Sequence, residues 1–272
     1  MNLYAVGCSF THGHGALPGP ANVCKHGDFV VNTHGKFDYA WPWQLESHFD
    51  AVINDGYQGA GNDYVLRRTL RMLAHLDDAD LKDWVFVIQT TQPERKEFLD
   101  GVHNMFYKTL FHSLDDRDNT GLDTHEHVVY AQHESQKVST DINLSQLQCQ
   151  HASGFYYYCW DDEYMVYDHL KDLLLLINVL ENRRCKYLIS GMTATQFVPE
   201  HIISHYNTEN DYSHEFAKLI KTQHHIKCFS EILHTVDPHE ATHTSPCYHP
   251  NELGHREISS YILNEIKQRG WL

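Results

Sequence analysis

The stretch NLYAVGCSFTHGHG (residues 2–15) runs from apolar residues directly into a glycine, a cysteine and a serine. A short apolar run that ends at a glycine predicts a buried β-strand over residues 2–7. Ser9 would then follow the strand at the start of a helix or turn, where its hydroxyl is exposed and backbone N–H groups can meet an anion. Acyl transfer needs both a nucleophile and donors for an oxyanion, so Ser9 is a candidate nucleophile.

Strand and helix patterns alternate along the rest of the chain. Apolar runs predict further strands at 51–54, 84–89, 185–190 and 226–232. The run WVFVIQ at 84–89 has no polar alternation before its last residue, which predicts burial on both faces. Apolar residues three and four apart predict helices at 63–76, 161–183 and 258–266. This alternation indicates a three-layer α/β/α sandwich with a mostly parallel sheet of about five strands.

One polar segment interrupts the alternation. Residues 112–160 contain DDRDNTGLDTHEH and end near the aromatic cluster FYYYCW. A loop of this length inside a compact domain is usually functional or disordered. We therefore expect a single domain over residues 1–272 with an insertion, a lid or an interface, at about 112–160.

Composition restricts the partners and the compartment. The formal net charge of −15 disfavours a general nucleic-acid role, and Arg67, Arg68 and Arg71 are interpreted as the solvated face of a helix. The seven cysteines are scattered without a CxxC pair, and no basic region precedes an apolar stretch at the N-terminus. The longest aliphatic run, 173–177, is too short to cross a membrane. We expect a reduced, cytoplasmic protein without a membrane partner, and a homo-oligomer is left open.

Two other segments supply groups that a nucleophilic serine needs. The segment NDGYQGAGND (54–63) follows the second predicted strand; its glycines let a ligand approach the backbone, and Asn62 can cap the next helix. The segment CYHPNELGHREISSYI (247–262) places His249 on a loop that enters the last helix. A histidine there can reach the strand ends and act as a general base.

Together the three segments resemble the blocks of the SGNH/GDSL hydrolase family, in order and in strand context. VGCSFT is similar to the first block, NDGYQGAGN to the second and HPNELGH to the last. The resemblance covers both ends and the first third of the chain. It implies a flavodoxin-like architecture without a cofactor, in which Ser9 is the nucleophile, His249 is the base, and the Ser9 and Gly59 N–H groups form the oxyanion hole. His255 would order the start of the helix.

The chain departs from the family pattern at the third block, which normally reads Gly-x-Asn-Asp. Here the stretch is VIQTTQPER, and the simplest alignment places Gln92 near the family's oxyanion-binding asparagine. Thr91 and Arg95 are alternative donors, and Asn62 is a weaker candidate. Cys8 stands where many relatives have aspartate; a cysteine nucleophile is conceivable, but Ser9 fits the register of the block better.

The last block also departs from the pattern, because Pro246 stands where the family has its acidic residue. The base still needs a partner that fixes its tautomer. That partner is either a backbone carbonyl in the loop 243–248 or a carboxylate, Asp237 or Glu240. We expect the carbonyl, because neither acid has the family spacing.

Histidines are abundant, 23 in all, and several are paired or clustered: 12 and 14, 125 and 127 around Glu126, and 224 and 225. None of these has HExxH or paired Cys/His spacing, so we expect no metal. His12, His14 and Arg95 are candidate substrate-binding residues. The predicted function is hydrolysis of a small or carbohydrate ester with an O-acetyl or short acyl group. A non-catalytic binding or assembly module of the same fold, an acyltransferase and a histidine-rich metal protein are the alternatives.

Overall fold

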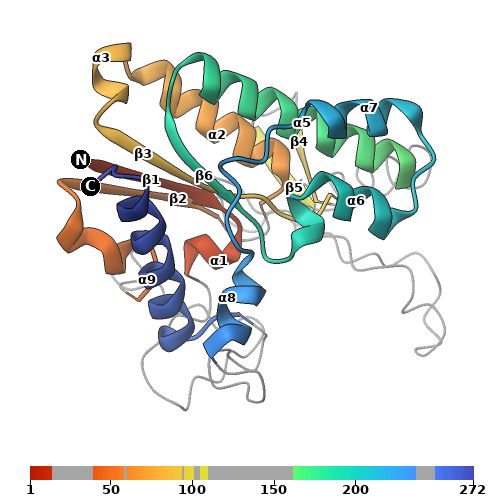
Figure 1. Ribbon diagram of the computed structural model, residues 1–272. Helices are drawn as coiled ribbons and strands as arrows, with labels where there is room; N and C mark the ends of the chain where they lie inside the picture. The colour runs from red at the N-terminus through yellow and green to blue at the C-terminus, as the bar shows by residue number, and fades with distance from the viewer. Residues whose placement is uncertain (14–38, 58–59, 94, 101–104, 110–161, 237–248) are drawn as a thin grey trace.

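The computed structural model describes residues 1–13, 39–57, 60–93, 95–100, 105–109, 162–236 and 249–272 (Figure 1). Its main sheet has four parallel strands in the order β2-β1-β3-β6. β1 (Asn2–Gly7) pairs with β2 (Ala51–Gly56) on one side and with β3 (Trp84–Gln89) on the other. β6 (Lys186–Ser190) completes the sheet beside β3. Because the strands are parallel and in register, the carboxyl ends of β1, β2 and β3 meet at one edge.

The two central strands form the middle of the core. Leu3 to Val6 of β1 and Val85 to Ile88 of β3 are fully buried. The edge strand β2 is only partly buried along most of its length. This confirms the burial on both faces that the apolar run of β3 predicts.

Helices cover both faces of the sheet, as Figure 1 shows. α2 (Asn62–His75) and α5 (Asp162–Asn182) lie on one face, and α8 (Phe229–Val236) and α9 (Glu252–Gln268) lie on the other. The three-layer α/β/α arrangement is therefore confirmed. The shorter helical elements are α1 (Ser9–His12), η1 (Trp43–His48), α3 (Asp78–Leu81), η3 (Ala194–Gln196), α6 (Pro199–Tyr206) and α7 (Asp211–Leu219).

The predicted fifth strand at 226–232 is wrong, because most of that segment belongs to α8. Before α8, the described chain pairs with β6 in one isolated bridge, in which Ile189 N–H donates to the His224 carbonyl and Ile226 N–H donates to the Ile189 carbonyl. The helix then starts, and Glu231 accepts a hydrogen bond from the backbone N–H of Cys228 at 2.9 Å. A glutamate at the third helical position that bonds back to the residue before the helix is half of a capping box.

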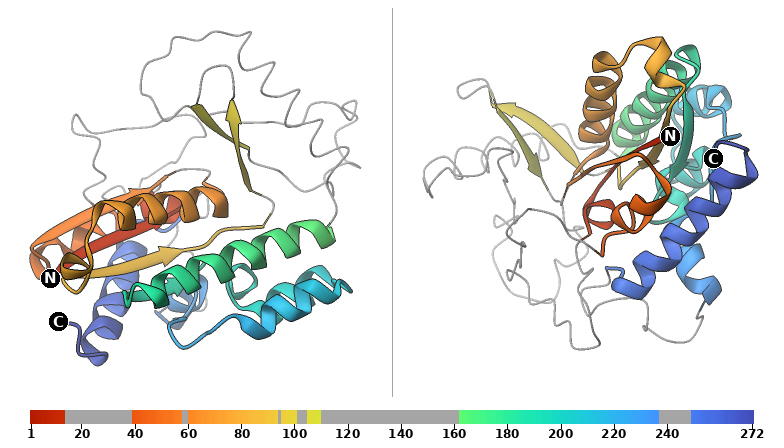
Figure 2. Two further views of the ribbon diagram at one scale, coloured as in Figure 1. Left: turned by 90° about the horizontal axis from the view of Figure 1, so that it is seen from above. Right: turned by 90° about the vertical axis from the view of Figure 1, so that its left-hand side faces the viewer.

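A second, two-stranded sheet is separate from the main one. β4 (Lys96–Asp100) and β5 (Met105–Thr109) pair in antiparallel fashion and extend away from the main sheet (Figure 2). The sequence pattern did not predict this hairpin. The predicted insertion at 112–160 lies outside the described residues, so the insertion and the single-domain boundary stay predictions. In the described part of the chain, no helix is long and apolar enough to span a bilayer.

Candidate active site

Ser9 lies directly beyond the end of β1, as the first residue of α1. Cys8 precedes the helix in an extended conformation, and its carbonyl accepts hydrogen bonds from the N–H groups of Thr11 and His12. Gly13 ends the helix with φ of 100°, a left-handed conformation that suits glycine. The Ser9 side chain is therefore held on a tight turn at the carboxyl edge of the sheet, and it is only 4% exposed.

His249 reaches the same point from the other end of the chain. Its Nε2 lies 2.9 Å from Ser9 Oγ, although the two residues are 240 positions apart. The ring of Phe10 stacks on the imidazole with 4.8 Å between the ring centroids. Asn251, two residues after His249, caps α9 by accepting a hydrogen bond from Gly254 N–H at 3.0 Å, which fixes the start of the helix. A serine and a histidine at this distance can exchange a proton.

The turn that carries Ser9 is tied to both neighbouring strands. From β3, Gln89 accepts a hydrogen bond from Thr11 Oγ1 at 2.6 Å and donates to Cys8 Sγ at 3.2 Å. From β2, Asn54 donates to the Thr11 carbonyl at 2.9 Å. Sequence reasoning missed Gln89 and Asn54. Their sequence signal is that each is a polar side chain at or near the end of a predicted strand.

Asn62 has a different role from the cap that was predicted. It is the first residue of α2, and the capping position belongs to Gly61. The Asn62 amide accepts from Thr91 N–H and donates to the Thr91 carbonyl, each at 2.9 Å. It thereby holds the backbone that follows β3, where Gln92 is exposed and Thr91 is buried.

The other predicted site residues are placed only in part. His12 ends α1, and its ring lies 6.1 Å from that of Tyr57. Arg95 is partly buried, its backbone N–H donates to the Gln92 carbonyl at 3.2 Å, and its carbonyl lies close against Gly61. Gly59 and His14 lie outside the described residues, as do Asp237, Glu240 and the loop 243–248, so their roles stay predictions. His255 is fully buried, and its Nδ1 accepts a hydrogen bond from Trp41 N–H at 3.2 Å.

The arginines of α2 are less solvated than predicted. Arg68 forms a two-point ion pair with Asp55 at the end of β2, and Arg67 lies over the ring of Tyr64. Asp55 also accepts a hydrogen bond from the Tyr4 hydroxyl at 2.9 Å, and burial, followed by the Asp55 charge, raises the pKa of Tyr4. Only Arg71 is exposed as the helix pattern predicts. Two of the three arginines are thus engaged within the fold.

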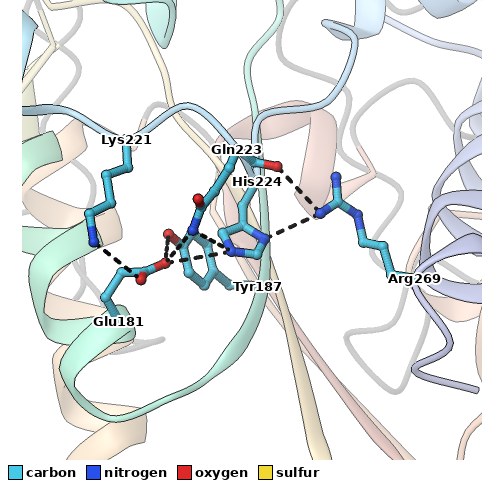
Figure 3. Close-up of polar contacts among 6 residues, drawn as sticks. All are labelled: Glu181, Tyr187, Lys221, Gln223, His224 and Arg269. Carbon is cyan, nitrogen blue, oxygen red and sulfur yellow. Dashed lines mark hydrogen bonds and ion pairs between the residues drawn. The ribbon is translucent and has the colours of Figure 1, made fainter.

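Histidines 224 and 225, one of the histidine pairs noted in the sequence, lie beside β6. Figure 3 shows His224 between Glu181 and Arg269, with Nε2 3.5 Å from Glu181 Oε1 and Nδ1 3.3 Å from Arg269 Nη1. Burial, and then the Arg269 charge, lowers the pKa of His224 while Glu181 raises it. Among the described residues, no three His, Cys, Asp or Glu side chains lie close enough together to hold a metal ion. Residues 125–127 lie outside that part of the chain.

The chain is similar to several solved structures. No family model and no curated protein matches the sequence. Similar structures include a lipolytic protein of the G-D-S-L family from Veillonella parvula, with 12% identity, 97% of both chains covered and a TM-score of 0.45. The esterase EstA from Pseudoalteromonas sp. has 9% identity over 98% of both chains, with a TM-score of 0.44. The acetyl xylan esterase Est2A from Butyrivibrio proteoclasticus has 10% identity, with 100% of this chain and 65% of that chain covered and a TM-score of 0.44.

Proposed function

We propose that the protein is a serine hydrolase that cleaves carboxylic esters with a short acyl group, such as an O-acetyl group on a small molecule or a carbohydrate. The observation that carries this proposal is the 2.9 Å contact between Ser9 Oγ and His249 Nε2 at the carboxyl edge of a parallel sheet. Ligands of open α/β sheets bind at that edge. The motif resemblance at both ends of the chain supports the same roles.

In the proposed reaction, Ser9 Oγ attacks the carbonyl carbon of the ester while His249 Nε2 takes the hydroxyl proton. The tetrahedral intermediate breaks its bond to the alcohol oxygen, and the protonated imidazole gives its proton to that leaving group. Water then attacks the acyl-enzyme with His249 again as the base. The carboxylic acid leaves, and the proton returns to Ser9.

The oxyanion needs hydrogen-bond donors at the point where its charge develops. We assign this role to the backbone N–H groups of Ser9 and Gly59 and to the Gln92 side chain. Support for Gln92 comes from the Asn62 amide, which fixes the adjacent Thr91 backbone with two hydrogen bonds of 2.9 Å. Because the backbone next to Gln92 is already fixed, less reorganisation is needed when the substrate binds.

Hydrolysis of p-nitrophenyl acetate tests the proposal. Ser9→Ala and His249→Ala are each expected to lower kcat by at least about a thousandfold, because a nucleophile and its base act as a unit. Ser259→Ala is the matched control, since Ser259 is also buried but its hydroxyl donates to the Arg256 carbonyl of the same helix, α9. Turnover by folded Ser9→Ala at the wild-type rate would contradict the proposal, and loss of activity in Cys8→Ala alone would move the nucleophile to Cys8.

A further inference from the structure

Gln89 is a fully buried amide at the carboxyl end of β3, next to the end of β1. Its two polar atoms have different partners: Oε1 accepts from Thr11 Oγ1 at 2.6 Å, and Nε2 donates to Cys8 Sγ at 3.2 Å. A buried amide is costly unless its polar atoms are hydrogen-bonded, and here both polar atoms of Gln89 have a partner.

The two partners of Gln89 flank the nucleophile. Cys8 immediately precedes Ser9, and Thr11 follows it by two residues, with its N–H donating back to the Cys8 carbonyl at 3.1 Å. Thr11 is fully buried and Cys8 is 2% exposed. One amide therefore fixes the start of the turn and its first helical residues together.

Gly7 packs directly against the hydrogen bond between Thr11 and Gln89. A Cβ at Gly7 would lie 2.5 Å from Thr11 Oγ1 and 2.6 Å from Gln89 Oε1, which is far too close. The space that a side chain would fill is thus occupied by the hydrogen bond between Thr11 and Gln89. The bridge is part of the packed core below the turn and is not a surface contact.

The side-chain N–H of Gln89 also donates to Cys8 Sγ, which is a second possible acceptor for the Ser9 hydroxyl proton. Cys8 Sγ lies 3.9 Å from Ser9 Oγ, while His249 Nε2 lies 2.9 Å from it. The hydroxyl can therefore turn either to the sulfur or to the imidazole. The hydrogen bond from the Gln89 side chain uses one of the two lone pairs of the sulfur. Sulfur is a weak acceptor, and the imidazole nitrogen is closer to Ser9 Oγ (2.9 Å against 3.9 Å), so the orientation toward His249 is favoured.

We infer that Gln89 is a positioning residue for the nucleophile: its bridge between Cys8 and Thr11 holds Ser9 Oγ at hydrogen-bonding distance from His249 Nε2. The inference rests on the proposed function, because it assigns Gln89 a role in that same site. Gln89 acts through the turn and does not touch the substrate. A displacement of about 1 Å in a reacting group can cost on the order of a hundredfold in rate.

Steady-state hydrolysis of p-nitrophenyl acetate by Gln89→Leu tests the inference. We expect kcat to fall by about ten- to a hundredfold while KM changes less than about threefold, because the substrate site itself is unaltered. Gln196→Leu is the matched control, since Gln196 is also buried but its Oε1 accepts from Met192 N–H in the turn after β6. Urea unfolding of both variants shows whether their losses of stability are comparable; kcat of the control should remain within threefold of wild type.

A folded Gln89→Leu with wild-type kcat, or a Gln196→Leu that loses as much kcat, would overturn the inference. If Gln89→Leu does not fold, Thr11→Val carries the test, because it keeps the shape and removes only the hydroxyl that bonds to Gln89. We expect a lower kcat with unchanged KM, and an unchanged kcat would overturn the inference. Failure of the proposed function can be told apart from failure of this inference, because it appears as full activity in Ser9→Ala, independently of the Gln89 variants.

Discussion

At the scale of single residues, Gly56 shows how closely α1, which carries Ser9, approaches the end of β2. A Cβ at this position would lie 2.4 Å from the backbone nitrogen of His12 and 2.7 Å from the backbone carbon of Thr11. These are main-chain atoms, so they cannot rotate out of the way. Glycine at the end of β2 is therefore required for α1 to lie where it does.

Gly56→Ala should push α1 away from β2. We expect a loss of stability of about 1–3 kcal/mol, as for other overpacked sites, and a fall in kcat because Ser9 moves with the helix. Gly270→Ala is the control: its Cβ meets nothing within 4 Å, and only its φ of +67° opposes a side chain. Urea unfolding and ester hydrolysis measure the two effects, and wild-type values in Gly56→Ala would show that the turn has room to adjust.

His225 gives the fold a dependence on pH. Burial, and then the neighbouring His224, lowers its pKa from 6.5 to about 4, and its ring packs against Phe197. Between these pH values the unfolded chain binds a proton that the folded chain does not, so stability falls as the pH drops through this window. The full difference is on the order of 3 kcal/mol.

His225→Phe removes this titration and keeps a ring against Phe197. The free energy of unfolding of wild type should therefore decrease more steeply than that of His225→Phe between about pH 6.5 and pH 4. Parallel stability curves for wild type and His225→Phe would show that His225 titrates alike in both states.

At the scale of the elements, the cap of α9 serves both stability and the site. Asn251 bonds to Gly254 N–H at the start of α9, and Asn210 caps α7 by accepting from Tyr212 and Ser213 N–H. Replacing either asparagine with alanine should cost about 1 kcal/mol of stability. Only Asn251→Ala should also lower kcat, because His249 lies two residues before that cap. Equal kcat values for Asn251→Ala and Asn210→Ala would show that the cap of α9 does not determine the position of His249.

Most strands and long helices could be predicted from the sequence because their apolar residues recur at the spacing of a buried strand or helix face. The apolar run 84–89 became β3, and the helix expected at 161–183 became α5 (Asp162–Asn182). The segment 226–232 misled because its buried Ile226 and Cys228 alternate like a strand, whereas Phe229, Ile232 and Leu233 have helical spacing. The capping contact of Glu231 decides for the helix. The hairpin of β4 and β5 was not predicted because neither strand is clearly more apolar than the residues around it.

The positions of candidate site residues could be predicted where a motif places a residue directly after a strand or directly before a helix, and could not be predicted where packing decides. Ser9 and His249 follow such motifs, and the structure brings them together at 2.9 Å. Gln89 and Asn54 were missed because a polar residue at a strand end has no defined partner until the turn folds over it. Asn62 was assigned to a cap because the sequence does not show that the Thr91 backbone lies beside it.

At the scale of the whole molecule, the parallel sheet joins the two ends of the chain. β1 is the first strand and lies in the middle of the sheet, and α9 is the last helix and packs beneath it. Ser9 and His249, the proposed nucleophile and base, therefore approach each other only when the sheet and α9 have both formed. Their reactivity toward an organophosphorus reagent reports on this convergence directly.

Labelling with diisopropyl fluorophosphate, followed by mass spectrometry of the peptides, tests the central claim most directly. We predict a single phosphoryl adduct on Ser9, formed at a rate that His249→Ala lowers by at least about a hundredfold, since the histidine removes the hydroxyl proton. His75→Ala should label at the wild-type rate. No adduct on folded protein, an adduct on Cys8, or labelling of Ser9 at the same rate in His249→Ala would contradict the account.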